Sequence, residues 1–185
     1  GGKPIPTLQS IDVSDKVIYM NTFTKTLSST VRISYMVLPA SLTELFYKKL
    51  SFYSCTVSNF EQYTLARFME SGSFEKHINR LRNYYQNKRD AILEIFKTAP
   101  LDQYITIKEE DSGVHFMMKL KTERTEIDIL SDAKSKGIKL APLSKYFVGQ
   151  TSNMSFQNVY VMNYSSIDLE QLPLIFDALC HILIK

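Results

Sequence analysis

Residues 17–39 read VIYMNTFTKTLSSTVRISYMVLP, and this stretch decides how the rest of the chain is interpreted. Its two flanks, Lys16–Phe23 and Val31–Leu38, are rich in β-branched and aromatic residues and predict two strands. The polar loop between them, Thr24–Thr30, carries one lysine, Lys25. Both strands are apolar almost throughout, as in the middle of a covered sheet. Because a two-stranded ribbon is marginal in water, we expect the chain to be the tail of a larger protein.

The loop and the second strand hold residue types suited to a reactive carbonyl and a phosphate group. An amine that attacks a carbonyl needs a fixed position, which a short loop can give to Lys25. Arg32 follows seven residues later, and its planar guanidinium can donate two hydrogen bonds to a phosphate. Thr22 and Thr24 add hydroxyl groups. Thr-rich loops with one lysine are also common without such chemistry, so these residues alone leave a purely structural role open.

The same stretch resembles the lysine segment of fold-type I pyridoxal-phosphate proteins. It is most similar to the MocR subfamily of GntR transcriptional regulators, whose usual form is close to VIYxGTFSKTLxPGLRxGYxVxP. Three further segments resemble this subfamily: PIPTLQSID at 4–12, GSFEKHINRLRNYYQNKRDAILEIF at 72–96 and SGVHFMMKL at 112–120. The resemblance covers nearly the whole chain and weakens after Phe147.

The resemblance implies roles for four residues. Lys25 matches the lysine that forms a Schiff base with pyridoxal phosphate, the catalytic position in the related enzymes. Arg32 matches the phosphate-binding arginine, and Thr22 matches a phosphate-contacting hydroxyl. Thr24 stands in place of the usual serine and is a weaker candidate for the phosphate. The chain has no Cys or His spacing typical of a metal site, and we expect none.

The chain also departs from the subfamily pattern. Ser29-Thr30 replaces the usual Pro-Gly of the loop, and Ser34 replaces a glycine. The strand near the C-terminus of such proteins often carries an arginine that holds a substrate carboxylate. The matching stretch, Val159–Tyr164, has no arginine, and none follows Arg124. Pyridoxal phosphate itself is therefore favoured as the effector over a particular amino acid.

The resemblance implies an α/β (α+β) fold, namely the C-terminal fragment of a fold-type I aminotransferase-like domain. Residues 1–75 would be a remnant of the large cofactor-binding domain, and residues 76–185 the small C-terminal domain with a short antiparallel sheet and helices. The ring contacts of the cofactor and a winged-helix DNA-binding domain would precede this chain. We therefore expect a pyridoxal-phosphate homodimer bound to DNA in the full-length parent, and no retained cofactor in this fragment.

Three functions compete at this point. The first is the effector-sensing domain of a GntR/MocR-type bacterial regulator, which is not itself an enzyme. The second is a fragment of a pyridoxal-phosphate-dependent class I/II aminotransferase. The third is a packing domain that has lost its ligand, which the presence of both Lys25 and Arg32 disfavours.

Periodicity places the remaining elements. Helices are predicted over 41–50, 58–70, 74–96, 126–136 and 168–184. Pro173 lies inside the last of these, and it would fall in the first turn if that helix started late, near Leu172. Strands are predicted over 104–108, 113–120 and 158–164, with a short extended segment at 138–143. Ser41 with Glu44 predicts a capping box, Ser73 predicts an N-cap, and Gly137 predicts a helix stop.

Composition sets outer limits. Hydrophobic residues make up 44% and charged residues 22%, as in ordinary globular proteins, and no apolar run is long enough to cross a membrane. The net charge is +3, and the basic region Lys76–Arg89 is interpreted as a solvated helix face and not as a DNA-binding surface. Cys55 and Cys180 are expected to be small buried hydrophobes in a cytoplasmic protein, and His115 a core histidine.

Overall fold

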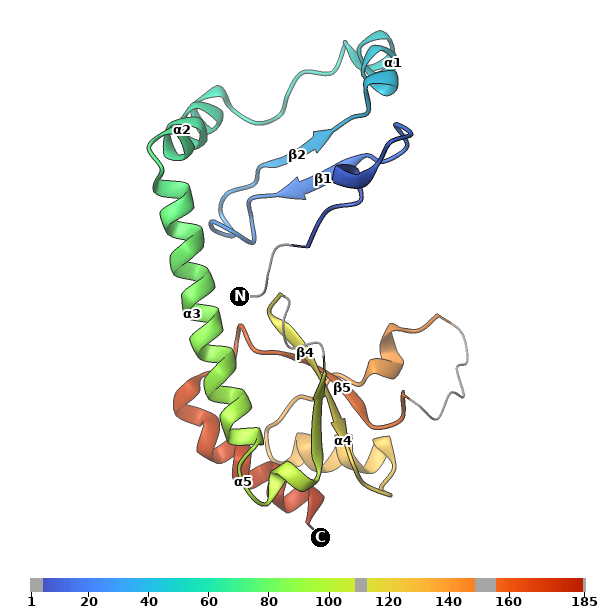
Figure 1. Ribbon diagram of the computed structural model, residues 1–185, viewed down its shortest axis with the longest axis vertical. Helices are drawn as coiled ribbons and strands as arrows, with labels where there is room; N and C mark the ends of the chain where they lie inside the picture. The colour runs from blue at the N-terminus through green and yellow to red at the C-terminus, as the bar shows by residue number, and fades with distance from the viewer. Residues whose placement is uncertain (1–4, 109–112, 149–155, 185) are drawn as a thin grey trace. The chain divides into compact units, whose positions relative to one another are not determined.

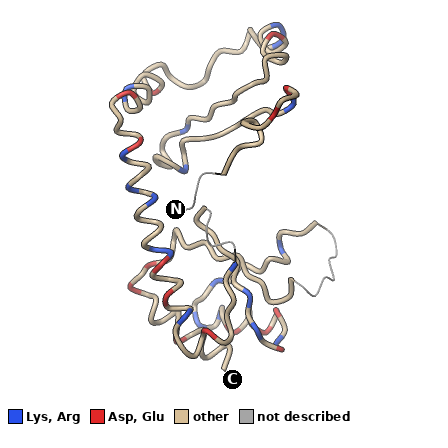
Figure 2. The backbone as a smooth tube through the Cα atoms, in the orientation of Figure 1, with Lys and Arg blue, Asp and Glu red and all other residues tan. Residues whose placement is uncertain are grey.

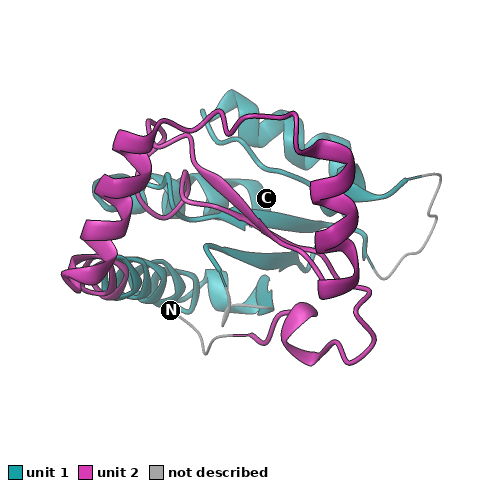
Figure 3. Ribbon diagram, turned by 90° about the horizontal axis from the view of Figure 1, so that it is seen from above, with its two compact units in different colours: residues 1–3, 81–185 teal, residues 4–80 magenta. Residues whose placement is uncertain are grey.

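The computed structural model describes residues 5–108, 113–148 and 156–184 (Figure 1). The chain forms two compact units, one of residues Pro4–Arg80 and one that contains Leu81–Lys185 (Figure 3). Helix α3 (Ser73–Phe96) contributes its first residues to the former and the rest to the latter. Among the described residues, no helix is both long and apolar enough to span a bilayer.

The N-terminal unit is built on a hairpin. Strands β1 (Tyr19–Thr22) and β2 (Ser34–Val37) pair antiparallel, with Thr22 opposite Ser34. The predicted pair of strands around a polar loop is therefore confirmed, with shorter bounds. A 3-10 turn (Gln9–Ile11) precedes the hairpin, and helices α1 (Ala40–Leu50) and α2 (Asn59–Glu70) follow it.

Apolar side chains on this hairpin are open to solvent. Met20 is 72% exposed and its cross-strand neighbour Met36 is 44% exposed. In the part of the chain that the structure describes, the sheet consists of β1 and β2 alone. The strands that the sequence predicted to be apolar almost throughout therefore carry side chains that are open to solvent in this structure.

The C-terminal unit contains a three-stranded antiparallel sheet in the order β3-β4-β5. Its strands are β3 (Ile105–Lys108), β4 (His115–Leu120) and β5 (Val159–Asn163). Helices α4 (Glu126–Ser135) and α5 (Leu172–Leu183) accompany the second half of α3. Short 3-10 segments, among them Leu101–Gln103, Leu143–Tyr146 and Leu169–Gln171, connect these elements. This arrangement confirms the small α+β architecture expected from the sequence.

The core of this unit follows from alternation along β4. Phe116, Met118 and Leu120 are buried, while the residues between them are partly exposed. They pack in one cluster with Ile92 of α3 and Leu179 of α5. The predicted strand over 113–120 is therefore confirmed with shorter bounds, and its alternate side chains belong to the core.

The start of α2 has a cap that the sequence analysis did not assign, and the start of α1 lacks the cap that it did assign. Ser58 caps α2, since its hydroxyl accepts a hydrogen bond from the backbone N–H of Glu61 at 3.2 Å. The capping box predicted from Ser41 is wrong. Pro39 is the N-cap of α1, and its carbonyl accepts bonds from Leu42 and Thr43, so Ser41 already lies inside the first turn.

Three other expectations are corrected. His115 is exposed, because it begins β4 on the face opposite Phe116. Cys55 is exposed and lies in the connection between α1 and α2. Lys88, within the basic region of α3 (Figure 2), is only 6% exposed, so that region is not wholly a solvated face.

The expected extended segment at 138–143 is extended at Pro142, which forms an isolated bridge with Tyr160, and a 3-10 turn begins at Leu143.

Candidate functional site

The lysine loop begins with one turn of helix-like backbone. The N–H groups of Thr26 and Leu27 both donate to the carbonyl of Phe23, at 3.1 and 2.9 Å. The N–H of Phe23 in turn donates to the carbonyl of Ile33 at 3.0 Å. These bonds hold Lys25 within a closed turn directly after β1.

The hydroxyl groups of Thr22 and Thr24 tie the two arms of the loop together. Thr24 Oγ1 donates to the carbonyl of Val31 at 2.9 Å. Thr22 Oγ1 lies 3.2 Å from the carbonyl of Ile33 and 3.1 Å from Thr24 Oγ1. Since a hydroxyl has one proton, each group donates its proton to an acceptor within the hairpin. Their observed role is therefore to close the loop, and either would have to turn to donate to a phosphate.

Lys25 and Arg32 are placed next to this closure. Lys25 follows Thr24 and Arg32 follows Val31, so each adjoins one partner of the Thr24–Val31 bond. Both residues are exposed. Among residues 5–108, 113–148 and 156–184, neither side chain has a hydrogen bond or ion pair. The amine and the guanidinium are both available to a ligand.

Helix α3 supports the loop through two residues. Phe74 meets Phe23 edge to face, with ring centroids 6.1 Å apart, and His77 Nε2 lies 2.9 Å from the carbonyl oxygen of Thr26. The sequence analysis gave His77 no role. His77 and Thr26 are 51 residues apart along the chain, so no local pattern joins them.

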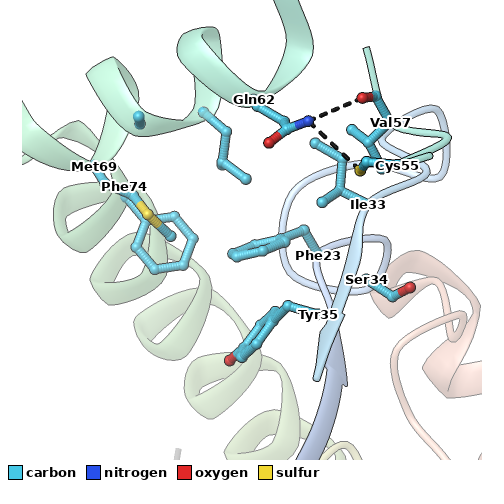
Figure 4. Close-up of a pocket in the computed structure, with 11 residues that line it drawn as sticks. Phe23, Ile33, Ser34, Tyr35, Cys55, Val57, Gln62, Met69 and Phe74 are labelled. Carbon is cyan, nitrogen blue, oxygen red and sulfur yellow. Dashed lines mark hydrogen bonds between the residues drawn. The ribbon is translucent and has the colours of Figure 1, made fainter. Parts of the chain in front are cut away.

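A pocket of about 540 Å³ lies beside the loop, between the hairpin and α2 (Figure 4). Phe23, Ile33 and Met69 are among its lining residues. No charged side chain lines it, and neither do Lys25, Arg32, Thr22 or Thr24. The pocket is apolar and does not suit a phosphate, so it is separate from the predicted cofactor residues.

Arg124 is the last arginine of the chain, and its guanidinium is already bonded to other residues of the C-terminal unit. Arg124 donates to the carbonyl of Ile182 at 2.8 Å and pairs with Asp132 at 2.7 Å. It is thereby committed to joining α4 and α5. Across the described residues, no three Cys, His, Asp or Glu side chains gather as metal ligands would.

The chain is similar in sequence to known bacterial transcriptional regulators. No model of a known protein family matches the chain. The HTH-type transcriptional regulator YdeL of Bacillus subtilis is 39% identical over 143 residues, which is 77% of this chain and 31% of that protein. The probable rhizopine catabolism regulatory protein MocR of Rhizobium meliloti is 31% identical over 168 residues, 90% of this chain and 33% of that protein.

Among solved structures, kynurenine aminotransferase of Pyrococcus horikoshii matches all of this chain and 44% of its own, with a TM-score of 0.75 and 23% identity. That likeness concerns the fold. The chain spans about a third of the length of the curated regulators that it matches. Regulators and aminotransferases thus share this segment. The chain has the aminotransferase-like fold of the fold-type I class, and it belongs to the MocR-type family of GntR transcriptional regulators.

Proposed function

We propose that this chain is the effector-sensing part of a bacterial transcriptional regulator, and that Lys25 is the residue to which pyridoxal phosphate is attached. The observation that carries the proposal is the lysine loop. It presents the exposed amine of Lys25 and the exposed guanidinium of Arg32 on either side of one hydrogen-bonded closure, and neither group has a partner in the part of the chain that the structure describes. A primary amine and a planar cation are the donor set that an aldehyde with a phosphate group requires.

Each residue would have a distinct task at this site. When bound, pyridoxal phosphate supplies an aldehyde carbon that an amine can attack and a ring that withdraws electrons. The amine of Lys25 would bond to that carbon. Arg32 would hold the phosphate with two parallel N–H donors. Thr22 would add a third contact by turning its hydroxyl from the Ile33 carbonyl, and Thr24 is the weaker candidate because its bond to Val31 is shorter.

The covalent role of Lys25 is tested in the full-length protein that carries this chain. Added pyridoxal phosphate should produce visible absorbance, and borohydride reduction should leave the cofactor on the peptide that contains Lys25. Lys25→Arg keeps the charge but has no attacking amine, so it should abolish both signals, while Lys16→Ala should change neither. Unchanged absorbance in Lys25→Arg would show that another group holds the cofactor.

The phosphate role of Arg32 has its own test. Arg32→Lys keeps a positive charge but loses the two-pronged geometry, so affinity for pyridoxal phosphate should fall about tenfold. Affinity for pyridoxal, which has no phosphate, should not change. An equal loss for both ligands would mean that the substitution disturbs the loop and that Arg32 does not contact the phosphate.

We further propose that binding by this chain alone is weak, because the ring of the cofactor needs contacts that the loop does not provide. In the whole regulator, a second subunit and an N-terminal winged-helix DNA-binding domain would complete the cytoplasmic protein. Loss of the Lys25 absorbance on excising the 185-residue chain is the expected result, and undiminished affinity in the excised chain would refute this part.

The effector proposed is pyridoxal phosphate itself. An amino-acid effector needs a cation for its carboxylate, and the last arginine of the chain, Arg124, is committed to Ile182 and Asp132. Titration of the full-length protein on its DNA in the presence of pyridoxal phosphate alone should change its DNA affinity. If an added amino acid is required, the effector is wrongly assigned, although attachment at Lys25 could still hold.

A further inference from the structure

The turn that carries Lys25 lies along the first turns of helix α3. Phe23 and Phe74 meet at one end of this contact, and Thr26 and His77 meet at the other. Both pairs are three residues apart in their own segments, which is close to one helical turn. Lys25 therefore sits between two fixed points. Figure 4 shows the rings of Phe23 and Phe74 turned toward one another.

The two fixed points differ in chemistry. The Phe23–Phe74 contact is an apolar, edge-on pair of rings. Phe68 of α2 adds a third ring, whose centroid lies 6.3 Å from that of Phe74. The other contact is a hydrogen bond, in which Nε2 of His77 donates to the carbonyl oxygen of Thr26 over 2.9 Å. This requires the proton to be on Nε2, because the carbonyl can only accept.

No second donor to this carbonyl is found in the described part of the chain. The Thr26 carbonyl and the Leu27 N–H form one peptide unit, whose N–H donates to the carbonyl of Phe23 and whose carbonyl is held by α3. The peptide unit before it, which follows Lys25, is held through the Thr26 N–H, which also donates to Phe23. The direction in which the lysine side chain leaves the backbone depends on how these two units are held. A small tilt there is amplified along a four-methylene chain at Nζ.

We infer that His77 is a positioning residue for Lys25, which holds the backbone of the lysine turn through the Thr26 carbonyl so that the amine is presented to the aldehyde carbon of the cofactor. The inference rests on the proposed attachment of pyridoxal phosphate at Lys25. His77 itself contacts backbone and not cofactor, so its effect reaches the amine only through the turn.

Two substitutions separate the hydrogen bond from simple packing. His77→Gln keeps an N–H donor at the position of Nε2 but removes the ring. His77→Phe keeps the ring but removes the donor. A positioning role predicts that Gln preserves function and Phe impairs it, whereas a packing role predicts the reverse. Lys76→Gln, on the neighbouring exposed residue, is the matched control.

The first readout is the cofactor bond in the full-length protein. Borohydride reduction after a fixed exposure to pyridoxal phosphate, followed by peptide mass analysis, measures the fraction of Lys25 that is modified. His77→Phe should need about tenfold more cofactor for half modification, as expected for loss of one hydrogen bond with an acceptor left unpaired. His77→Gln and Lys76→Gln should lie within about twofold of the wild type, and His77→Phe at the wild-type value would overturn the inference.

The second readout needs no cofactor. Hydrogen exchange of the Thr26 and Leu27 amides should speed up in His77→Phe and not in His77→Gln, because the anchored turn opens more often. If the wild type leaves Lys25 unmodified, the proposed function fails and the inference falls with it. If the wild type is modified and exchange is the same in all variants, the inference alone is wrong.

Discussion

Two fully buried tyrosines of the C-terminal unit should respond in opposite ways to the same substitution. Tyr160 and Tyr164 are both 0% exposed and both belong to the same core cluster. The hydroxyl of Tyr164 donates to the carbonyl of Gly113 at 2.6 Å. The hydroxyl of Tyr160 has no hydrogen-bond partner among the described residues. Replacement by phenylalanine keeps the ring in both cases, so only the hydroxyl is tested.

The magnitudes follow from these contacts. A hydrogen bond contributes about 1 kcal/mol net to folding, so Tyr164→Phe should lower the free energy of unfolding by about that amount. A buried polar group without a partner costs about 1–3 kcal/mol, so Tyr160→Phe should raise the free energy of unfolding by about 1 kcal/mol. The two variants should therefore differ by about 2 kcal/mol, a factor of about 30 in the unfolding equilibrium.

The assay is urea unfolding, with amide hydrogen exchange of β4 and β5 to report on the C-terminal unit by itself. The midpoint should move in opposite directions while the denaturant slope stays the same. Equal losses of stability in both variants would refute the reasoning, because the Tyr160 hydroxyl would then have a partner that stabilises the fold.

Three further predictions concern pH and helix ends. Burial raises the pKa of Tyr160 and of Tyr164, so the folded state keeps protons that the unfolded chain releases near about pH 10. The urea midpoint should therefore fall as the pH rises above about 10, and it should fall less in the variant with both tyrosines replaced by phenylalanine. Ser58→Ala removes the cap that accepts from Glu61 and should cost about 1 kcal/mol in thermal or urea unfolding, where Ser51→Ala should have little effect. Gly137 has φ +76° and free space around it, so Gly137→Ala should lower the unfolding free energy by about 1 kcal/mol through backbone strain alone.

The elements that sequence reasoning placed correctly depend on local patterns. The run 113–120 predicted the strand that the structure has at His115–Leu120, and the apolar spacing from Phe74 to Phe96 predicted α3. The starts of helices were predicted less well. Pro39 is the N-cap of α1, so Ser41 lies inside its first turn, and the Ser58 cap of α2 was not identified. Periodicity predicts the buried face and the approximate length of a helix or strand, but the first residue of a helix depends on the backbone geometry before it.

The roles assigned to Lys25, Arg32, Thr22 and Thr24 came from a resemblance in sequence, and they stay proposals. The structure adds that the threonine hydroxyls are bonded within the hairpin, while the amine and guanidinium have no partner among the described residues. Sequence alone could not separate these two pairs, because all four are polar residues within or beside one loop.

The sequence by itself determined the family, the order of helices and strands and the residue types around the lysine, because these depend on neighbours within a few positions along the chain. Only the tertiary structure decided that His77 meets Thr26, that Lys88 is buried with its amine on the Ser165 carbonyl, and that Tyr164 has a hydrogen-bond partner where Tyr160 has none. Each of these contacts joins segments about 50 or more residues apart or depends on which carbonyl faces a side chain. Such pairings are fixed by how the elements pack, and packing is a property of the whole unit.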